Sequence, residues 1–385
     1  MERRIVHLDL DSFFISVERL RDASLKQQPV IVGGVSDRGV VASCSYEARA
    51  FGVHAAMPIK LARQLCPQGI FIRGDYEQYS RYSAMVTQVI ESKAPLVEKA
   101  SIDEHYLDIS GMDKFFGCLK WSQELRQKII KETGLPISFG LSMNKTVSKI
   151  ATGESKPNGE LYVKDGLEKP FLAPLSIKKI PMIGDKTYTL LRNMGIERVR
   201  TIQEMPQSVM QQVLGDNGNT IWKKANGIDD TPVVPYRERK SVSSEVTFDK
   251  DTNDVEVLKE QLITMIDQLA FDLRKQQQLA ATITVKLRYS DFQTHTFQTK
   301  VNYTASDHIL REKALFLFDK NCNRRVLVRL IGVKLSSLVH GHQQIHLFED
   351  TNEMIALYQA MDKIRSRYGY NALVKGIQAK KDGKT

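Results

Sequence analysis

The amino-acid sequence predicts an α+β protein with several domains, and three observations lead to this prediction. The chain of 385 residues is longer than one hydrophobic core usually supports. Strand and helix patterns alternate over residues 1–165, helical patterns dominate residues 166–232, and strand patterns return after residue 241. The composition, 42% hydrophobic and 26% charged, is typical of a globular protein.

Composition and charge narrow the class of protein further. No stretch approaches the roughly 20 apolar residues that a membrane-spanning helix needs. The residues after Met1 lack the apolar region of a secretory signal, and the four cysteines lack metal-type spacing. A net charge of +10 suits a nucleic-acid partner, although basic and acidic residues are interspersed. We expect a cytoplasmic protein in which any face that binds nucleic acid must arise from folding.

The N-terminal residues predict a strand followed by a small subdomain. Residues 3–10 (RRIVHLDL) have the pattern of a buried strand, and Asp11 or Ser12 is suited to cap the helix that follows. Asp9 therefore lies where strand gives way to helix. The segments PVIVGG and GVVASCSY predict two more strands, and EARAFGV and PIKLARQLC predict short helices. Together they predict one compact subdomain.

The next residues predict a second set of strands and helices. A helical pattern begins at Tyr76, and VEKASIDEHYLDIS predicts two strands joined by a tight turn at Ser101–Glu104. The helix WSQELRQKIIKETG and the strand PISFGLS complete a β-α-β-β-α-β-like order. Ser142 or Asn144 is suited to cap the next helix, NKTVSKIATGE.

The remainder of the chain predicts a helical region, a linker, an α+β domain and a tail. The segment IKKIPMIGDKTYTLLRNMGI predicts two helices joined by a turn at Ile180–Gly184, which would point backbone N–H groups at a phosphate. A plain helical hairpin is the alternative. PVVPYRERK lacks periodicity and predicts a linker.

Three acidic residues form the main candidate for a reaction centre. In-line phosphoryl transfer requires divalent cations, and Mg²⁺ prefers carboxylate oxygens. Asp9 at a strand end and the pair Asp103–Glu104 in a turn meet this requirement. Neighbouring side chains on a regular strand point to opposite faces, so the pair must lie at a turn to serve one site. Spacing alone leaves open that all three are ordinary solvated acids.

Several segments resemble, in the same order, the motifs of Y-family DNA polymerases. They are IVHLDLDSFFISVE, CSYEARAFGV, AMP, SIDEHYLDIS, GLSMNKTVSKIA and SKPNG. The resemblance covers residues 1–345 and is closest to the DNA polymerase IV branch. It departs at His105, where the family commonly has a small residue, and at Met182, which stands in place of a turn glycine. His105 is either an ordinary neutral histidine or a residue that perturbs the site electrostatically.

The resemblance implies a right-hand polymerase with a palm, small fingers, a helical thumb and an α+β little finger. The implied ranges are residues 1–10 and 75–165 for the palm, 11–74 for the fingers, 166–232 for the thumb with its helix-hairpin-helix, 233–243 for a linker, 244–343 for the little finger and 344–385 for a tail.

The resemblance also implies roles for single residues at the reaction centre. The implied ligands of two Mg²⁺ ions are Asp9, Asp103, Glu104 and the backbone carbonyl of Leu10. The implied nucleotide-binding residues are Phe13, Phe14, Ser43, Tyr46, Arg49 and Lys156. Phe14 would be a steric gate against the ribose 2′-hydroxyl, and without the motif it would pass for a core residue of an amphipathic helix.

Further residues are implied to bind DNA and a protein partner. The implied DNA-binding residues are Ile183, Gly184, Lys186, Arg237, Arg239, Lys240, Arg325 and Arg329. Even spacing predicts that the last two share one strand face. Residues 344–348 resemble the peptide by which bacterial polymerases bind the sliding clamp, with Gln344, Leu347 and Phe348 as the contacts.

We therefore expect a monomeric DNA polymerase that adds dNTPs to a primer 3′-hydroxyl. Low fidelity is expected because no residues remain for a proofreading exonuclease domain, and the family resemblance implies translesion synthesis in DNA repair. Two alternatives stay open. One is another two-metal palm enzyme such as a nucleotide cyclase, and the other is a non-catalytic polymerase homologue that acts as a scaffold at lesions.

Overall fold

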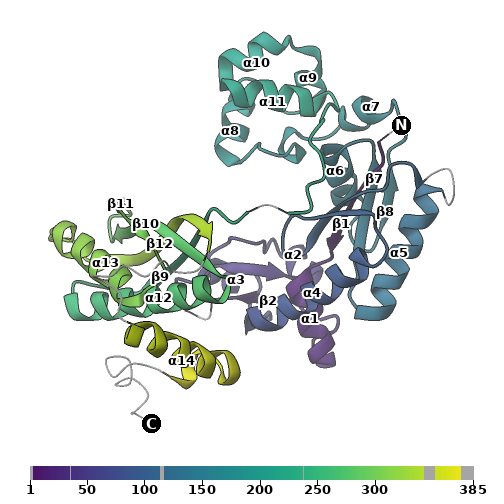
Figure 1. The fold of residues 1–385 in the computed structure, drawn as a ribbon. Coiled ribbons are helices and arrows are strands. Elements are labelled where there is room, and N and C mark those ends of the chain that lie inside the picture. The colour runs from purple at the N-terminus through teal and green to yellow at the C-terminus, as the bar shows by residue number, and fades with distance from the viewer. Residues whose placement is uncertain (1–2, 35, 113–116, 237, 342–351, 374–385) are drawn as a thin grey trace. The chain divides into compact units, whose positions relative to one another are not determined.

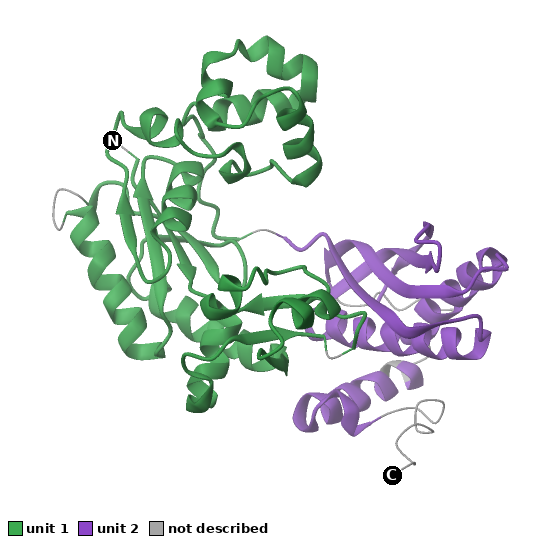
Figure 2. Cartoon of the chain, turned by 180° about the vertical axis from the view of Figure 1, so that it is seen from behind, with its two compact units in different colours: residues 1–237 green, residues 238–385 purple. Residues whose placement is uncertain are grey.

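The chain folds into two compact units, residues 1–237 and 238–385, which Figure 2 shows in two colours. Each unit combines a β-sheet with helices, which confirms the predicted α+β class (Figure 1). The computed structural model describes residues 3–34, 36–112, 117–236, 238–341 and 352–373. Within these ranges no helix is long and apolar enough to cross a membrane.

A five-stranded sheet is the centre of the first unit. Its strands, in spatial order, are β5 (Leu96–Lys99), β6 (Glu104–Asp108), β1 (Ile5–Leu10), β7 (Ile137–Ser142) and β8 (Glu160–Tyr162). Neighbouring strands run antiparallel except β7 and β8, which are parallel. β1 and β7 are buried along almost their whole length, as expected for strands covered on both faces.

Helices cover both faces of this sheet. Val6 and Leu8 of β1 share a core with α4 (Tyr76–Glu91) and α5 (Cys118–Thr133). His7, on the opposite face, is hydrogen-bonded to Thr152 of α6 (Lys145–Ser155). Because side chains alternate along a strand, Asp9 shares the α6 face with His7.

A smaller sheet lies between β1 and α4 in the sequence. It is built from β3 (Val41–Cys44), β2 (Val30–Gly33) and β4 (Ile70–Arg73), and the elements beside it are α1 (Phe13–Arg21), η1 (Ala23–Leu25), α2 (Tyr46–Ala50) and α3 (Ile59–Leu65). Ser45 caps α2, since its side chain accepts a hydrogen bond from the backbone N–H of Ala48 at 3.2 Å. The small sheet has an apolar core of its own.

The predicted helical region is present after β8. Its elements are α7 (Glu168–Leu172), η3 (Ile177–Lys179), α8 (Asp185–Asn193), α9 (Val199–Glu204), α10 (Gln207–Leu214) and α11 (Asp216–Ala225). The prediction of a full helix before the hairpin turn is wrong, because only the single 3₁₀ turn η3 forms there. Ile180 is extended because a residue before proline disfavours the helical conformation.

The second unit has a four-stranded antiparallel sheet covered by helices. The strands, in spatial order, are β11 (Thr294–Thr304), β10 (Gln278–Tyr289), β12 (Val328–His340) and β9 (Ser241–Thr252), and the helices are α12 (Val255–Lys275), α13 (Asp307–Asn321), α14 (Asn352–Tyr368) and the short η4 (Tyr370–Ala372). Ile283 and Leu287 point into the core shared with α12 and α13. Lys286 and Arg288 consequently point to the other face of the sheet.

Candidate active site

The register of β1 and β6 brings the predicted carboxylates to one edge of the sheet. Asp9 lies directly opposite Glu104, and the backbone N–H of Leu10 donates to the carbonyl of Asp103 at 3.1 Å. The predicted turn is present: Ser101 Oγ donates to the Asp103 carboxylate at 2.6 Å and accepts the Glu104 N–H at 3.0 Å. The turn thus lets Asp103 and Glu104 approach Asp9 although they are adjacent in sequence.

Two lysines contact these carboxylates directly. Lys156 donates to Asp9, and Lys149 donates to both carboxylate oxygens of Glu104 at 2.6 Å. As the side chains of the described residues lie in this arrangement, no three acidic, histidine or cysteine groups already form a metal site. Lysine ammonium groups neutralise two of the three acids instead.

The two opposed carboxyls differ in acidity. Burial raises the pKa of Asp9 to about 6, although Lys156 opposes this shift. Burial also raises the pKa of Glu104, but the His7 ring, whose Nε2 lies 3.8 Å from the carboxylate, and the hydrogen bonds from Lys149 outweigh it and bring the value down to about 2. Glu104 is therefore the more firmly ionised member of the pair at neutral pH.

Sequence reasoning did not single out Lys149. The residue lies in the motif GLSMNKTVSKIA, within α6, whereas Lys156 follows the end of that helix in an extended conformation. Its place in this motif was the available signal. The partner of Lys149 could not be inferred, because Glu104 lies 45 residues away along the chain.

Asp11 has a different role from the predicted helix cap. Its carboxylate is buried and accepts hydrogen bonds from Ser138 Oγ at 2.9 Å and from the Asn158 N–H at 2.7 Å. Ser12 occupies the cap position of α1 with a φ of 42° and makes no capping bond through its side chain. Ser12 is therefore at the predicted cap position without supplying a capping bond, and Asp11 instead holds the turn that follows Lys156.

The nucleotide-binding candidates Tyr46 and Arg49 lie close to the end of β1. Arg49 donates to Ser12 Oγ at 3.3 Å, and its guanidinium carbon lies 4.6 Å from the centroid of the Tyr46 ring. The Tyr46 hydroxyl is buried, and the described residues offer it no hydrogen-bond partner. Burial, assisted by the Asp11 carboxylate, raises the pKa of Tyr46. The structure thus brings Tyr46, Arg49 and Lys156 together around β1.

The aromatic candidates occupy different environments. Phe14 is half-buried and stacks on Tyr79, with ring centroids 4.2 Å apart and planes 12° apart. Phe13 is 3% exposed and belongs to the core of the large sheet. Ser43 is half-buried in β3. Of the two phenylalanines, Phe14 retains the more accessible ring.

His105 lies on the α4 side of the sheet rather than beside the carboxylates. Its Nε2 is 3.0 Å from Thr87 Oγ1, and burial, helped by the nearby Lys99 ammonium, lowers the pKa of His105 to about 3. The ring is therefore a neutral buried histidine.

The hairpin turn adopts the conformation that glycine usually provides. Met182 has a φ of 81°, and its side chain is 52% exposed. The backbone N–H of Ile183 donates within the turn, to Ile180 at 3.2 Å. Gly184 is the N-cap of α8 and Lys186 lies in its first turn. Methionine at position 182 therefore preserves the turn.

The basic candidates near the second unit fall in three settings. Arg239 and Lys240 are exposed, whereas Arg237 lies outside the described residues. Arg329 lies over the Phe292 ring, with its guanidinium carbon 4.6 Å from the centroid. The prediction that Arg325 shares a strand face with Arg329 is wrong, because β12 begins only at Val328. The clamp-binding candidates Gln344, Leu347 and Phe348 also lie outside the described residues.

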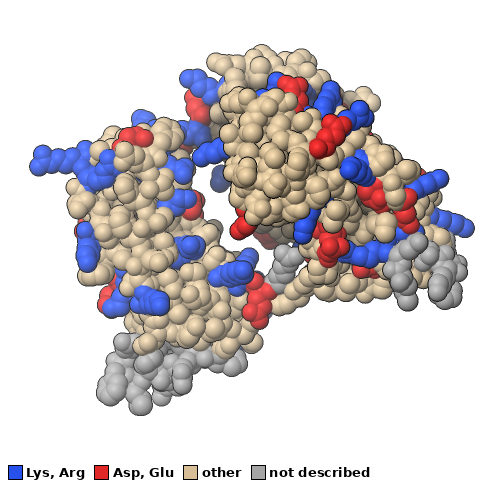
Figure 3. Space-filling view, turned by 90° about the horizontal axis from the view of Figure 1, so that it is seen from above, with Lys and Arg blue, Asp and Glu red and all other residues tan. Residues whose placement is uncertain are grey.

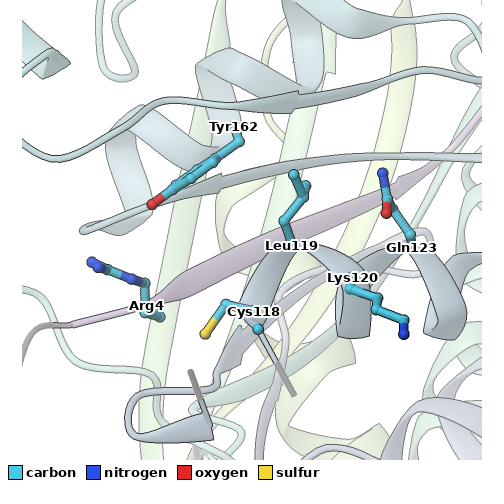
Figure 4. A pocket seen from close by; sticks show the side chains of 7 residues that line it. Arg4, Cys118, Leu119, Lys120, Gln123 and Tyr162 are labelled. Atoms are coloured by element: carbon cyan, nitrogen blue, oxygen red, sulfur yellow. The ribbon is translucent and has the colours of Figure 1, made fainter. Parts of the chain in front are cut away.

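Surface charge and cavities do not by themselves mark a site. Figure 3 shows lysine and arginine side chains on both units, with acidic side chains among them. A cavity of about 410 Å³ lies at the start of α5, where Arg4, Lys120, Gln123 and Tyr162 surround it (Figure 4). None of the three candidate carboxylates lines this cavity.

Comparisons with known proteins identify the family. Residues 8–153 match the impB/mucB/samB family, and residues 239–347 match its C-terminal domain. A DNA polymerase IV of Dehalococcoides mccartyi is 37% identical over 378 residues, which are 97% of each protein. A DNA polymerase IV of Methanoculleus marisnigri is 40% identical over 347 residues, covering 88% of this chain and 95% of the relative.

Solved structures agree with these sequence matches. A Y-family DNA polymerase chimera of Dbh and Dpo4 superposes with a TM-score of 0.78 at 28% identity, covering 88% of this chain and all of the chimera. An insertion ternary complex of Dbh DNA polymerase gives a TM-score of 0.64 at 27% identity, with the same coverage. The chain therefore belongs to the Y-family DNA polymerases, in their DNA polymerase IV branch.

Proposed function

We propose that this chain extends a DNA primer by two-metal nucleotidyl transfer at Asp9, Asp103 and Glu104, and that it does so with low fidelity in translesion synthesis. The observation that carries the proposal is the β1–β6 register, which places Asp9 opposite Glu104 at the edge where the Asp103 turn begins. Family membership supports the polymerase activity.

The donor set suits Mg²⁺. Carboxylate oxygens of Asp9, Asp103 and Glu104, with the Leu10 carbonyl, would hold two ions. The contacts that Lys149 and Lys156 make with these acids support the fit, because they mark a partly buried anionic site that needs cationic partners. When bound, the ions would neutralise charge on the transferred phosphoryl group and activate the primer 3′-hydroxyl.

Protein groups would orient the incoming dNTP. Arg49 offers a guanidinium that suits phosphate oxygens, and the buried Tyr46 hydroxyl is a donor without a partner among the described residues. Lys156 would release Asp9 and donate a hydrogen bond to a phosphate oxygen of the dNTP instead. Phe14, held against Tyr79, would fill the space of a ribose 2′-hydroxyl. Ser43 and the backbone near Phe13 would line the same pocket.

The remaining parts would bind DNA without reading its sequence. Gly184 and Lys186 at the start of α8 would contact a phosphate through backbone N–H groups, and Arg239 and Lys240 would follow the backbone. The proposed palm, fingers, thumb, linker and little finger keep the ranges predicted above. We further propose that the protein is a cytoplasmic monomer and that its residues 344–348 bind the sliding clamp.

Primer extension with Mg²⁺ tests the proposed reaction. The parent should extend a primer, and Asp103→Ala should lower the rate by roughly a hundredfold or more, because a lost metal ligand removes several kcal/mol of charge stabilisation. Glu132→Ala, an exposed acid on α5 across the sheet, should extend at the parental rate. A parent that binds primer–template without extending it would instead be a scaffold, and nucleotide turnover that needs no primer would indicate a cyclase-like enzyme.

A further inference from the structure

A group of polar side chains lies beneath the turn that carries Asp103 and Glu104, on the side of the sheet covered by α4. Lys99 ends β5 before the turn, and His105 follows Glu104 in β6. Ser83 belongs to α4, and both Ser83 and His105 are 0% exposed. Polar groups buried at this depth destabilise a protein unless they are hydrogen-bonded.

These side chains form one continuous chain of hydrogen bonds. Lys99 Nζ donates to Ser83 Oγ at 2.7 Å and to Thr87 Oγ1 at 3.0 Å. Ser83 Oγ donates in turn to the carbonyl of Ile102, which is in the turn itself. Thr87 Oγ1 donates to the carbonyl of Ser83 at 2.8 Å and lies 3.0 Å from His105 Nε2. One branch therefore runs from Lys99 through Ser83 to the Ile102 carbonyl inside the turn, and the other runs from Lys99 and His105 through Thr87 to the Ser83 carbonyl in α4.

The direction of each bond follows from the donors and acceptors present. Thr87 donates its hydroxyl hydrogen to the Ser83 carbonyl. Thr87 Oγ1 can therefore only accept hydrogen bonds from Lys99 and His105. His105 must then carry its hydrogen on Nε2. Lys99 and His105 thus donate to the two α4 hydroxyls, which donate onward to backbone carbonyls, and bonds aligned in this way reinforce one another.

We propose that Ser83, Thr87 and His105 are positioning residues for the carboxylates of Asp103 and Glu104. Ser83 fixes the Ile102 carbonyl from the α4 side, while the Leu10 N–H fixes the Asp103 carbonyl from β1. Two successive carbonyls of the turn are thereby held from different elements. This role rests on the proposed function of the carboxylates as metal ligands, and supporting hydrogen bonds of this kind orient ligands in metal sites generally.

Replacement of Thr87 by valine tests the role, because valine keeps the shape and loses the hydroxyl. Thr87→Val should lower kcat by about tenfold, since small misplacements at a reaction centre are costly, and should leave the dNTP KM nearly unchanged. It should also raise the Mg²⁺ concentration for half-maximal rate. Binding of Ca²⁺, measured by calorimetry with a dideoxy-terminated primer–template, should weaken in parallel. Thr87→Ser keeps the hydroxyl and should therefore keep the parental kcat and the parental dependence on Mg²⁺ and Ca²⁺.

Thr133→Val is the matched control. Thr133 also donates to the carbonyl four residues before it, Ile129, at 2.7 Å, but it lies in α5 away from the turn. The Thr133→Val variant should have a lower Tm but the parental kcat and the parental dependence of the rate on Mg²⁺. If Thr87→Val behaves like this control, the positioning role is overturned. If Asp103→Ala still extends primers, the proposed function fails instead, so the two failures are distinguishable.

Discussion

At the scale of single residues, the carboxylates of Asp9 and Glu104 are distinguished by the charged groups that contact them. Asp9 and Glu104 face each other across two strands, and each is also contacted by a lysine from α6 or the turn after it. Burial and pairing separate the two pKa values, to about 6 for Asp9 and about 2 for Glu104. Groups with separated acidities in one partly buried site are typical of functional centres.

Phe14 provides a residue-scale prediction about sugar selection. Phe14→Ala should lower discrimination against ribonucleotides at least about tenfold, because steric exclusion in a pocket has an effect of this order. Phe14→Tyr keeps a ring that can stack on Tyr79 and should keep the discrimination. Competing rNTP and dNTP incorporation in primer extension measures the ratio. Equal ratios in parent and Phe14→Ala would remove the gate assignment.

The same residues show what the sequence could predict. Asp9 at the end of a strand and Ser101–Glu104 as a turn follow from local patterns, and both are present. The partners of Asp11 lie 127 and 147 residues away, so local capping rules misassigned it. Local signals identify what a residue is suited to do, and tertiary contacts decide which option is used.

At the scale of elements, α14 is held to α12 and α13 by charged side chains. Arg274 of α12 donates to both carboxylate oxygens of Asp362 in α14, at 2.6 and 2.9 Å. It also donates to Asp307 of α13 at 2.6 Å. Arg365 is 1% exposed and lies over the Tyr370 ring, with its guanidinium carbon 4.4 Å from the centroid. Arg274 therefore joins the three helices α12, α13 and α14.

Asp362→Asn should loosen α14 selectively. Loss of the charged, two-point bond to Arg274 should speed amide hydrogen exchange of residues 352–368 by about tenfold, which corresponds to roughly 1.4 kcal/mol. Asp319→Asn removes an exposed ion pair with Lys259 and should change exchange very little. Mass-spectrometric exchange on the full chain measures both. Unchanged exchange of α14 in Asp362→Asn would contradict the anchoring role of Arg274.

Element boundaries were the least predictable feature. The predicted shared face of Arg325 and Arg329 required a strand that includes Arg325, but β12 begins at Val328. The helical pattern before the hairpin shortened to η3 because Pro181 keeps Ile180 extended. The predicted strand is present but begins at Val328, whereas only a 3₁₀ turn forms where a helix was predicted.

At the scale of the whole molecule, a net charge of +10 accompanies interspersed acidic and basic residues. Figure 3 shows the same mixture on the folded surface. A polymerase that binds DNA irrespective of sequence needs phosphate contacts, and each contact releases counterions. Overall charge therefore indicates the class of partner, while the residues that touch phosphate must be found by measurement.

The salt dependence of DNA binding tests the proposed phosphate contacts. Replacing both Arg239 and Lys240 by alanine should reduce the slope of log K against log salt by about 2, because each lost phosphate contact removes close to one released counterion. The matched control replaces Lys120 and Lys131 of α5, which covers the sheet face opposite Asp9, and should leave the slope unchanged. Fluorescence anisotropy with one primer–template across a salt series measures the slopes. Equal slopes for the two double variants would show that Arg239 and Lys240 contribute no more to phosphate binding than any other exposed cations.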